Sequence, residues 1–360
     1  MGDTDPFGNE RARMMAKDNP TAGSMLNKDD LIVIAGAGGF IAGALARYFH
    51  EQGFTRIRAV DKKPLPQWYQ RTPGTECLCM DLQYEDNCKR ACEGAVEVYN
   101  LAADMGGMGF IERFRIECLR SILINTHMIE AAYRAGAQRY FFSSSACAYN
   151  TELQKDPNCR ALKESDAYPA MAERGYGWEK LMSEMFCQEY WAERGLWTAI
   201  ARFHNVYGPF GTWDGGREKA PAAICRKVIE AKDTGADQIV IWGTGRQTRS
   251  FMFIDDCVQG IDMITHCERL IATPINLGSS QLISINDLVS LAEGIGGITL
   301  KRKYDMEAPT GVAGRNSDNT FIQEVLGWQP STPFEVGLKK TYDWIKTQYM
   351  DRKAGKRTVS

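Results

Sequence analysis

A strand, a glycine turn and a helix follow one another in LIVIAGAGGFIAGALARYFHEQG, residues 31–53. The first letters form a short apolar run, which predicts a buried strand, and the last have the apolar spacing of an amphipathic helix. Gly36, Gly38 and Gly39 occupy the turn between these two elements. A strand that passes through a tight turn into a helix predicts a parallel sheet, because parallel strands need such crossover connections.

The same alternation continues as far as Asn205. Short apolar runs separated by helical patterns predict further strands at IRAVDKK, CLCMDL, VEVYNLAA, RYFFSSSA and WTAIARFHN. This order predicts an α/β protein with a Rossmann-type, doubly wound parallel sheet. After Asn205 the pattern loosens, and QIVIWGTG, PINLG and two late helical patterns predict a smaller, mixed α/β C-terminal region that closes over a ligand.

Composition argues against several classes of protein. With 44% hydrophobic residues, 24% charged residues and a formal charge of -2, the chain has no electrostatic reason to bind nucleic acid or an anionic membrane. No apolar run approaches the roughly 20 residues that span a bilayer. The first residues also lack the apolar stretch of a secretory signal. We therefore expect a cytoplasmic protein.

The cysteines and histidines show no metal-binding pattern. The 11 cysteines are scattered, and the close pair Cys77 and Cys79 is not matched by a second pair at zinc-ligand spacing. The four histidines are likewise spread along the chain. We expect reduced cysteines and no bound metal.

The glycine turn is suited to a dinucleotide. Backbone N–H groups of Gly36, Gly38 and Gly39 and the positive end of the following helix can meet a pyrophosphate. Asp61 ends the next strand, where a carboxylate accepts hydrogen bonds from both ribose hydroxyls of an adenosine and repels a 2'-phosphate. This favours NAD over NADP, although Lys62 and Lys63 could soften the discrimination.

Further residues are expected to border the NAD. Asp81 follows the third strand, at a position from which side chains reach an adenine ring, and its alternative role is that of a helix cap. The remaining candidates begin the first helix or follow the fourth strand, and they are Phe40, Ile41, Leu101, Ala102 and Ala103.

A tyrosine and a lysine form a candidate redox pair. Tyr176 and Lys180, in YGWEK, are four residues apart at the start of a helical pattern, so both lie on one helix face. A tyrosine hydroxyl loses its proton near pH 10, and a neighbouring ammonium together with a nicotinamide cation stabilises the phenolate. Tyr176 could then remove a hydroxyl proton while the adjacent carbon gives a hydride to NAD. Ser144 or Ser145, at the end of the preceding strand, could hydrogen-bond the same hydroxyl.

Taken together, GAGGFIA, Asp61, the serine-rich strand end and YxxxK resemble the extended short-chain dehydrogenase/reductase family, the NAD-dependent epimerases and dehydratases of nucleotide sugars. The resemblance covers residues 30–345 and departs at Ala42, where many members have a third glycine. Alanine is small enough for the same close packing. In this family a nucleotide-bound sugar is transiently oxidised at C4.

The segment after the serines separates the possible reactions. Members that eliminate water commonly carry an Asp–Glu pair there, whereas this chain reads SSSACAYN, with Cys147 and no carboxylate. Once C4 is a ketone, the hydrogens on C3 and C5 become acidic, and inversion needs a base on one face and an acid on the other. Cys147 and a lysine could form that pair, and Lys219, in GGREKAPAA, is the candidate lysine.

Several long motifs resemble the members of this family that epimerise GDP-hexoses at C3 and C5. These motifs are AADMGGMGF, SSACAY, KESDAYPA, RFHNVYGPFGTW, GGREKAPAA, QTRSF and GRNSDN. The resemblance implies that Cys147 and Lys219 are the acid/base pair and that Tyr176 and Lys180 perform the redox step with a tightly bound, recycled NAD.

The same resemblance implies a substrate site. Gly107 and Met108 would border the sugar, and Asn205 would hold the substrate. The residues implied to contact the nucleotide diphosphate are Lys227, Gln247, Arg249 and Arg315, for which an arginine fork is well suited. The alternative for Arg249 is a salt bridge with Asp255 or Asp256.

The chain departs from these epimerases in two places that flank the sugar. Asn150 stands where they have proline, and residues 110–121 and 151–162 look less similar. The hexose and the inverted carbons therefore stay open. The alternatives are a nucleotide-sugar 4-epimerase or 4,6-dehydratase of the same family and, more remotely, a non-catalytic nucleotide-sensing protein.

We expect four segments along the chain. Residues 1–28 would be a flexible lead-in, residues 29–205 the NAD-binding Rossmann domain with contributions from later segments, residues 206–348 mainly the nucleotide-sugar-binding domain, and residues 349–360 a flexible tail. The resemblance also implies a homodimer, in which the predicted helices 117–135 and 176–194 of each subunit form a four-helix bundle.

Overall fold

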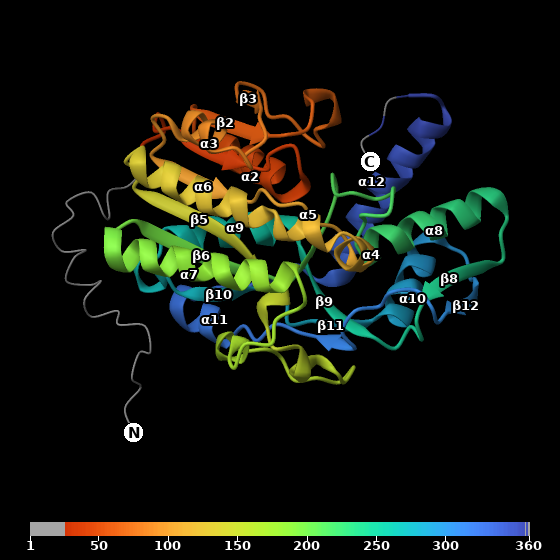
Figure 1. Cartoon of the computed structure of the whole chain (residues 1–360). Helices are drawn as coiled ribbons and strands as arrows, with labels where there is room; N and C mark the ends of the chain where they lie inside the picture. Colours follow the sequence, from red (N-terminus) through yellow and green to blue (C-terminus); the bar gives the residue numbers. More distant parts are fainter. Residues whose placement is uncertain (1–25, 357, 359–360) are drawn as a thin grey trace.

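The computed structural model describes residues 26–356 and 358 (Figure 1). The prediction of a flexible lead-in thus falls almost entirely outside the described residues. The strands are β1 (Ile32–Ala35), β2 (Ile57–Asp61), β3 (Glu76–Cys79), β4 (Glu97–Asn100), β5 (Arg139–Ser145), β6 (Trp197–Phe203), β7 (Asn205–Tyr207), β8 (Gln238–Trp242), β9 (Thr248–Phe253), β10 (Pro274–Leu277), β11 (Leu282–Ser284), β12 (Lys301–Asp305) and β13 (Gly314–Arg315).

The helices cover the sheets and connect their strands. They are α2 (Phe40–Glu51), α3 (Glu85–Cys92), α4 (Met108–Arg113), α5 (Arg115–Leu119), α6 (Ser121–Arg134), α7 (Tyr176–Arg194), α8 (Ala220–Thr234), α9 (Ile254–Thr265), α10 (Ile285–Gly296), α11 (Thr320–Leu326) and α12 (Phe334–Lys353). The predicted helix 176–194 is therefore confirmed. The predicted helix 117–135 is instead divided at Arg120 into α5 and α6.

A parallel seven-stranded sheet organises the larger lobe. Its strand order is β10-β6-β5-β4-β1-β2-β3, and every pair in it is parallel. Helices α3, α6 and α7 pack on one face, and α2 and α9 pack on the other (Figure 1). The predicted doubly wound fold is thus confirmed. Because the strand order reverses at β1, the carboxyl ends of β1 and β4 form the edge at which such folds bind dinucleotides.

The smaller lobe contains the remaining sheets. Strand β9 pairs with β7, β11 and β13, while β8 and β12 form a separate parallel pair. Helices α8, α10 and α12 pack against one another beside them (Figure 1). Strand β10, which we expected in this mixed region, instead pairs with β6 at the edge of the large sheet.

Helix α12 is longer than expected. It ends at Lys353, so the first five residues of the expected flexible tail are helical. The physical reason is pairing with α8, since the Tyr349 hydroxyl donates to Asp233 over 2.9 Å and the Lys353 ammonium lies 2.6 Å from the same carboxylate. These contacts add to the apolar packing between the two helices.

Within residues 26–356 and 358, no helix is long and apolar enough to cross a membrane. The same residues contain no cluster of three His, Cys, Asp or Glu side chains placed to hold a metal ion. All 11 cysteines lie in this range, and none forms a disulfide.

A buried ionic network supports the end of the large sheet opposite the candidate site. Glu97, at the start of β4, is fully buried and accepts hydrogen bonds from Tyr99 and Arg139. His266, at the C-terminal end of α9, lies 3.0 Å from the same carboxylate and 2.9 Å from Asp262. Burial acts to lower the pKa of His266, but hydrogen bonds and charge from Asp262 and Glu97 outweigh it and raise that pKa to about 10.

This network predicts a pH-dependent stability. An unfolded histidine titrates near pH 6.5. Charged His266 therefore contributes its full stabilisation below about pH 6.5, and this contribution is lost as the pH rises toward 10. We expect the free energy of unfolding of the unaltered protein to exceed that of His266→Gln by roughly 2 kcal/mol more at pH 6 than at pH 10, allowing for partial exposure. Urea unfolding at several pH values measures this difference, and a constant difference would contradict the prediction.

Candidate active site

The glycine turn forms a cradle that side chains would fill. Gly36 has a φ of 85°, and a Cβ atom at this position would lie 2.9 Å from the carbonyl oxygen of Leu101. A Cβ atom at Gly38 would lie 2.9 Å from the carboxyl carbon of Asp61. Gly39 precedes α2, whose first residues are Phe40 and Ile41. The N–H groups of Gly36, Gly38 and Gly39 already donate to the Val60 carbonyl, the Asp61 carboxylate and the Gly36 carbonyl, so the sequence prediction that they meet the pyrophosphate is not supported. The N-terminus of α2, which the compact turn leaves uncovered by side chains, is the place that fits the pyrophosphate of NAD.

Asp61 lies where the adenosine ribose of NAD is expected. It ends β2, and its two carboxylate oxygens accept from the backbone N–H groups of Gly38 over 3.0 Å and of Lys63 over 2.9 Å. Lys62 instead points to Asp104, with 2.6 Å between the ammonium and the carboxylate. Pairing with Asp104 engages the charge of Lys62, whereas the Lys63 ammonium stays at the glycine turn and donates to the Gly38 carbonyl over 3.4 Å. Asp61 still places a carboxylate at the expected ribose position, which favours NAD.

The remaining cofactor candidates lie at the ends of neighbouring strands. Leu101 continues from β4 and donates its backbone N–H to Ala35 of β1, so Leu101 to Ala103 run beside the glycine turn. Asp81 follows β3 and accepts from the backbone N–H of Gln83 over 3.0 Å. Helix α3 is preceded by Tyr84, so Asp81 is not its N-cap, and the alternative role is wrong.

The redox pair is at the start of α7, where the helix meets the end of β5. Tyr176 is the first residue of this helix, and the Lys180 ammonium lies 5.5 Å from the centre of its ring. Lys180 is 1% exposed. Gly177 permits the start of α7 to lie against the segment that follows β5, because any side chain on Gly177 would overlap the backbone carbonyl of Cys147.

The structure separates the two candidate serines. Ser145 accepts from the backbone N–H of Cys147 over 3.2 Å and is hydrogen-bonded to Tyr176. Ser144 points into the core, where its hydroxyl donates to Glu184, which is buried and paired with Arg202. Since successive residues of a strand face opposite sides, only one serine can reach the site. The prediction that Ser144 contacts the substrate is therefore not supported by its position.

Cys147 and Lys219 come from opposite lobes. Cys147 lies in the 3-10 turn Ala146–Ala148 after β5 and packs with Tyr176 in one apolar cluster. Lys219 immediately precedes α8 as its N-cap residue, and its charge acts on Cys147. The charge of each group thus affects the pKa of the other, and their joint action on a substrate stays a prediction.

The glycine loop of AADMGGMGF supports the Lys219 segment. Gly107 donates its backbone N–H to the carbonyl of Arg217 over 3.1 Å. A Cβ atom on Gly107 would lie 2.8 Å from the carbonyl oxygen of Glu218, so this close approach needs a glycine. Met108 starts α4 and lies against Gly311. The loop thus lies between the Lys219 segment and residues near 310.

The family model described as "NAD dependent epimerase/dehydratase family" matches residues 32–278. The chain belongs to this family. GDP-mannose 3,5-epimerase of Arabidopsis thaliana is 43% identical over 334 residues, which cover 91% of this chain and 85% of that protein. GDP-L-fucose synthase 1 of the same plant is 28% identical over 335 residues, which cover 91% of this chain and 97% of that protein.

Solved structures of family members share the fold. UDP-glucose 4-epimerase from Thermotoga maritima, solved with UDP-glucose, superposes with a TM-score of 0.78 at 21% identity, covering 88% of this chain and 99% of that one. MoeE5, in complex with UDP-glucose and NAD, has a TM-score of 0.72 at 25% identity and covers 89% of this chain and 99% of its own. The match to an NAD-dependent family, together with the glycine cradle and Asp61, supports NAD as the cofactor.

Burial dominates the electrostatics of this family member's site. Burial, followed by the charges of Cys147 and Glu179, raises the pKa of the Tyr176 hydroxyl well above its ordinary value, against the hydrogen bond from Ser145. This shift keeps the phenol protonated. We expected Lys180 and a nicotinamide cation together to stabilise the phenolate, and burial opposes that stabilisation because a buried phenolate loses its hydration.

The pKa values of the candidate acid/base residues Cys147 and Lys219 are shifted in opposite directions. Burial and then Glu173 raise the pKa of the Cys147 thiol, against Arg315, Ser145 and Lys219. Burial lowers the pKa of the Lys219 ammonium, and Arg315 adds to this, while Cys147 opposes it. An ordinary lysine titrates above an ordinary cysteine, so these shifts bring the two pKa values closer together. Passing a proton from the Lys219 ammonium to a Cys147 thiolate then costs less free energy.

Arg315 lies beside Cys147. Its guanidinium donates to the Cys147 sulfur over 3.4 Å, to Gln154 over 2.6 Å and to Glu173. The sequence placed Arg315 at the diphosphate, whereas the structure brings it to the acid/base pair. Arg315 reaches Cys147 because the start of β13 lies beside the segment that contains Gln154. The backbone carbonyl of Gln154 accepts a hydrogen bond from the N–H of Ala313 over 3.0 Å.

The other substrate candidates form two groups. Arg249 donates to the backbone carbonyls of Thr248, Thr310 and Val312 rather than to Asp255 or Asp256. Asn205, at the start of β7, donates to the carbonyl of Ser250 over 3.2 Å. Farther along, Lys227 and Gln247 both donate to backbone carbonyls of β8, those of Val240 and Trp242. The structure thus brings Arg249 near Arg315 and places Lys227 and Gln247 together at β8.

Sequence reasoning missed Glu173. Its carboxylate pairs with Arg315, and its backbone N–H donates to the carbonyl of Cys147 over 3.0 Å. Its position three residues before Tyr176 was the only local signal, and a single sequence cannot connect it to Arg315. Asn150, where the chain departs from related epimerases, caps the 3-10 turn Thr151–Gln154 by accepting from Glu152 over 2.9 Å.

Glu173 predicts a measurable property of the thiol. Its negative charge raises the pKa of Cys147, so Glu173→Gln should lower that pKa and increase the thiolate fraction at neutral pH. We expect the rate of iodoacetamide labelling at Cys147, followed by mass spectrometry at pH 7, to rise several-fold. Glu152→Gln, which removes a charge from an exposed pair with Lys155, is the matched control. An unchanged labelling rate in Glu173→Gln would contradict this electrostatic effect.

Proposed function

We propose that this protein is a GDP-mannose 3,5-epimerase that uses NAD as a tightly bound, recycled cofactor. The observation that carries this proposal is the packing of Cys147 with Tyr176, whose ring centre lies 5.5 Å from the Lys180 ammonium. We propose that Lys219, whose charge acts on Cys147, completes this group. Identity of 43% to GDP-mannose 3,5-epimerases of Arabidopsis thaliana and Oryza sativa supports the same reaction and substrate.

The chain's own residues divide the reaction into two parts. NAD, when bound, supplies the acceptor for the hydride of C4 and returns it at the end. Ser145 and Tyr176 hold the C4 hydroxyl, and Tyr176 takes its proton while Lys180 stabilises the charge that develops. The resulting ketone makes the hydrogens on C3 and C5 acidic.

Cys147 and Lys219 then carry out the inversion. One removes the proton from a carbon next to the ketone, and the other delivers a proton to the opposite face. Their converging pKa values suit groups that must each give or take a proton within one turnover. Tyr176 finally returns its proton to the C4 oxygen. Arg315, beside the Cys147 sulfur, stabilises negative charge at the thiol or at the enolate oxygen.

An excess of positive charge favours a dianionic substrate. Burial and then Arg315 lower the pKa of Arg249 to about 10, and burial lowers the pKa of Lys227. A diphosphate would stabilise the charged forms of Arg249 and Lys227 by pairing with both side chains. Arg249, Lys227 and Gln247 are therefore proposed to hold the GDP part, while Gly107, Met108 and Asn205 border the hexose.

A 4-epimerase is the second candidate, because a UDP-glucose 4-epimerase shares the fold. That reaction needs only hydride removal and return at C4, and it leaves a cysteine, an arginine and a lysine around C3 and C5 without a role. A 4,6-dehydratase is less favoured, since no carboxylate occupies the segment after Ser145.

Proton NMR of GDP-mannose in deuterated water tests the proposal. Loss of the H3 and H5 signals with new sugar species is the expected result. Loss of the H5 signal alone would establish a 5-epimerase, and inversion at C4 without exchange would establish the 4-epimerase. No reaction at all would refute GDP-mannose as the substrate.

The expected homodimer also remains a proposal. Helices α5, α6 and α7 pack together and expose large apolar side chains, which are Phe114, Ile116, Leu119, Leu123, Trp178, Met182 and Met185. Burying such a stripe against a second copy would give the four-helix arrangement. Light scattering should report a dimer that Met182→Glu converts to a monomer, and a monomeric unaltered protein would refute the proposed dimer.

The 11 free cysteines support the cytosol as the proposed compartment of this protein.

A further inference from the structure

The segment that carries Lys219 lacks regular structure of its own. Residues 208–219, here called the Lys219 loop, connect β7 to α8. Phe210, Gly215 and Gly216 have φ values of 66°, 91° and 84°. Positive φ values interrupt the repeating hydrogen bonds of helices and strands, so side chains must fix this loop.

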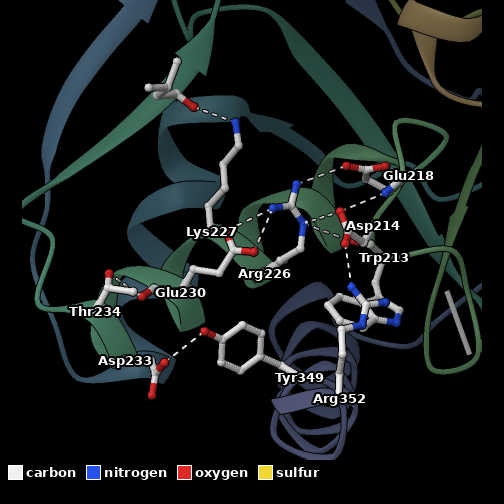
Figure 2. A network of polar contacts seen from close by, with 12 residues as sticks. Trp213, Asp214, Glu218, Arg226, Lys227, Glu230, Asp233, Thr234, Tyr349 and Arg352 are labelled. Atoms are coloured by element: carbon white, nitrogen blue, oxygen red, sulfur yellow. Dashed lines mark hydrogen bonds and ion pairs between the residues drawn. The ribbon is translucent and has the colours of Figure 1, made fainter. Parts of the chain in front are cut away.

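A first set of contacts comes from α8. Arg226 has 17% of its side chain exposed and lies at the centre of the network that Figure 2 shows. Its guanidinium donates to the carbonyl of Trp213 over 3.1 Å and to Glu218, the residue before Lys219, over 3.2 Å. It also lies 3.5 Å from the Asp214 carboxylate. Arg226 thus ties both ends of the Trp213–Glu218 segment to α8.

The second set comes from the far end of the chain. Arg352, in the last turn of α12, donates to Asp214 over 2.6 Å and stacks 4.1 Å above the ring of Trp213 (Figure 2). Trp213 is fully buried, so this stacking joins α12 to a fixed point of the loop. Asp214 is 138 residues from Arg352 in sequence and contacts both arginines.

The end of α12 is itself held in place. Tyr349 and Lys353 both bind Asp233 of α8, so the last turn of α12 is anchored before Arg352 reaches the loop. An isolated exposed ion pair contributes little to stability, but the pair of Arg352 with Asp214 belongs to a network. Asp214 also contacts Arg226, and Arg352 also stacks on the buried ring of Trp213. Burial acts to raise the pKa of Asp214, but the hydrogen bonds from Arg352 and the Gly215 N–H, followed by the charge of Arg226, hold it below its ordinary value.

We propose that the contact of Arg352 with Asp214 and Trp213 is a positioning device, by which the C-terminal helix holds the Lys219 loop and so sets the approach of Lys219 to the substrate. This proposal rests on the proposed function. It assigns no role to α12 in the redox step, since Tyr176 and Lys180 lie on α7 of the other lobe. Loosening the contact should therefore slow proton transfer and spare hydride transfer.

The experiment compares Arg352→Met with the matched variant Lys339→Met. Lys339 forms an exposed i,i+4 pair with Asp343 on the same helix and does not belong to the network in Figure 2. In Arg352→Met we expect deuterium incorporation at C3 and C5 of GDP-mannose to slow about tenfold. Single-turnover reduction of the bound NAD should stay within twofold, and Arg352→Lys should recover part of the loss because it keeps the charge. Lys339→Met should match the unaltered protein.

Equal slowing of both steps in Arg352→Met, or no slowing of exchange, would overturn the proposal. A second readout needs no substrate. Amide hydrogen exchange of the peptide covering residues 208–219, followed by mass spectrometry, should be faster in Arg352→Met and unchanged in Lys339→Met. Unchanged amide exchange in Arg352→Met would also overturn it. Absence of deuterium incorporation in the unaltered protein would refute the proposed function, and the amide measurement would still decide whether α12 holds the loop.

Discussion

Cys147→Ser and Lys219→Met should each slow deuterium incorporation at C3 and C5 of the substrate by about 10²–10⁴-fold, the usual contribution of general acid–base catalysis. Each variant removes one of the two groups that we propose to exchange a proton with the carbons next to the C4 ketone. The hydroxyl of Tyr176 stays in place in both, so single-turnover reduction of the bound NAD should change only a few-fold. Proton NMR in deuterated water and absorbance of the reduced nicotinamide measure the two steps separately.

Cys159→Ser is the matched control for the cysteine. Cys159 is partly buried, and the charges of Arg249 and Arg315 act on its pKa as Arg315 acts on that of Cys147. Cys159 nevertheless lies outside the apolar cluster that contains Cys147. This variant should exchange normally. Normal exchange in both Cys147→Ser and Lys219→Met would refute the acid/base assignment, while loss of NAD reduction in either would show that the residue acts earlier.

Tyr176→Phe should stop both steps. It removes the proposed acceptor of the proton from the C4 hydroxyl, so NAD reduction should fall by about 10²–10⁴-fold, and exchange should fall with it because no ketone forms. Tyr190→Phe is the control on the same helix, since the Tyr190 hydroxyl bonds Glu130 away from the site. Exchange that persists in Tyr176→Phe without NAD reduction would mean that the acidity of C3 and C5 does not depend on oxidation at C4.

The sequence correctly predicted those parts of the fold that are determined by residues close together in the chain. The glycine turn, the strands that follow it and the length of α7 were correct because each is set by a local apolar period or by a turn residue. Strand β10 was assigned to the wrong lobe. Its four residues read as a strand, but its pairing with β6 depends on where the chain returns after α9.

The candidate site shows the same limit. YxxxK has a spacing that one helix turn explains, and Tyr176 and Lys180 lie as predicted. Arg315 lies 168 residues from Cys147 in sequence, and only the crossing of β13 brings its guanidinium to the sulfur. The effect of burial on the pKa of Tyr176 was missed for another reason, because a sequence shows which charges are present and not how much water surrounds them.

The route of the chain between the lobes has a consequence for dissecting this protein. After β6 the chain enters the smaller lobe for β7 to β9, returns to the large sheet for α9 and β10, and leaves again for β11. A fragment that stops at residue 205 would keep the glycine turn and YxxxK but lose the strand that covers β6 and the helix that packs behind it. Its outer strand would present unpaired N–H and C=O groups beside bare apolar side chains, which is a template for aggregation. The two lobes are therefore one cooperative unit, and neither the cofactor half nor the sugar half can be prepared alone by cutting the chain once.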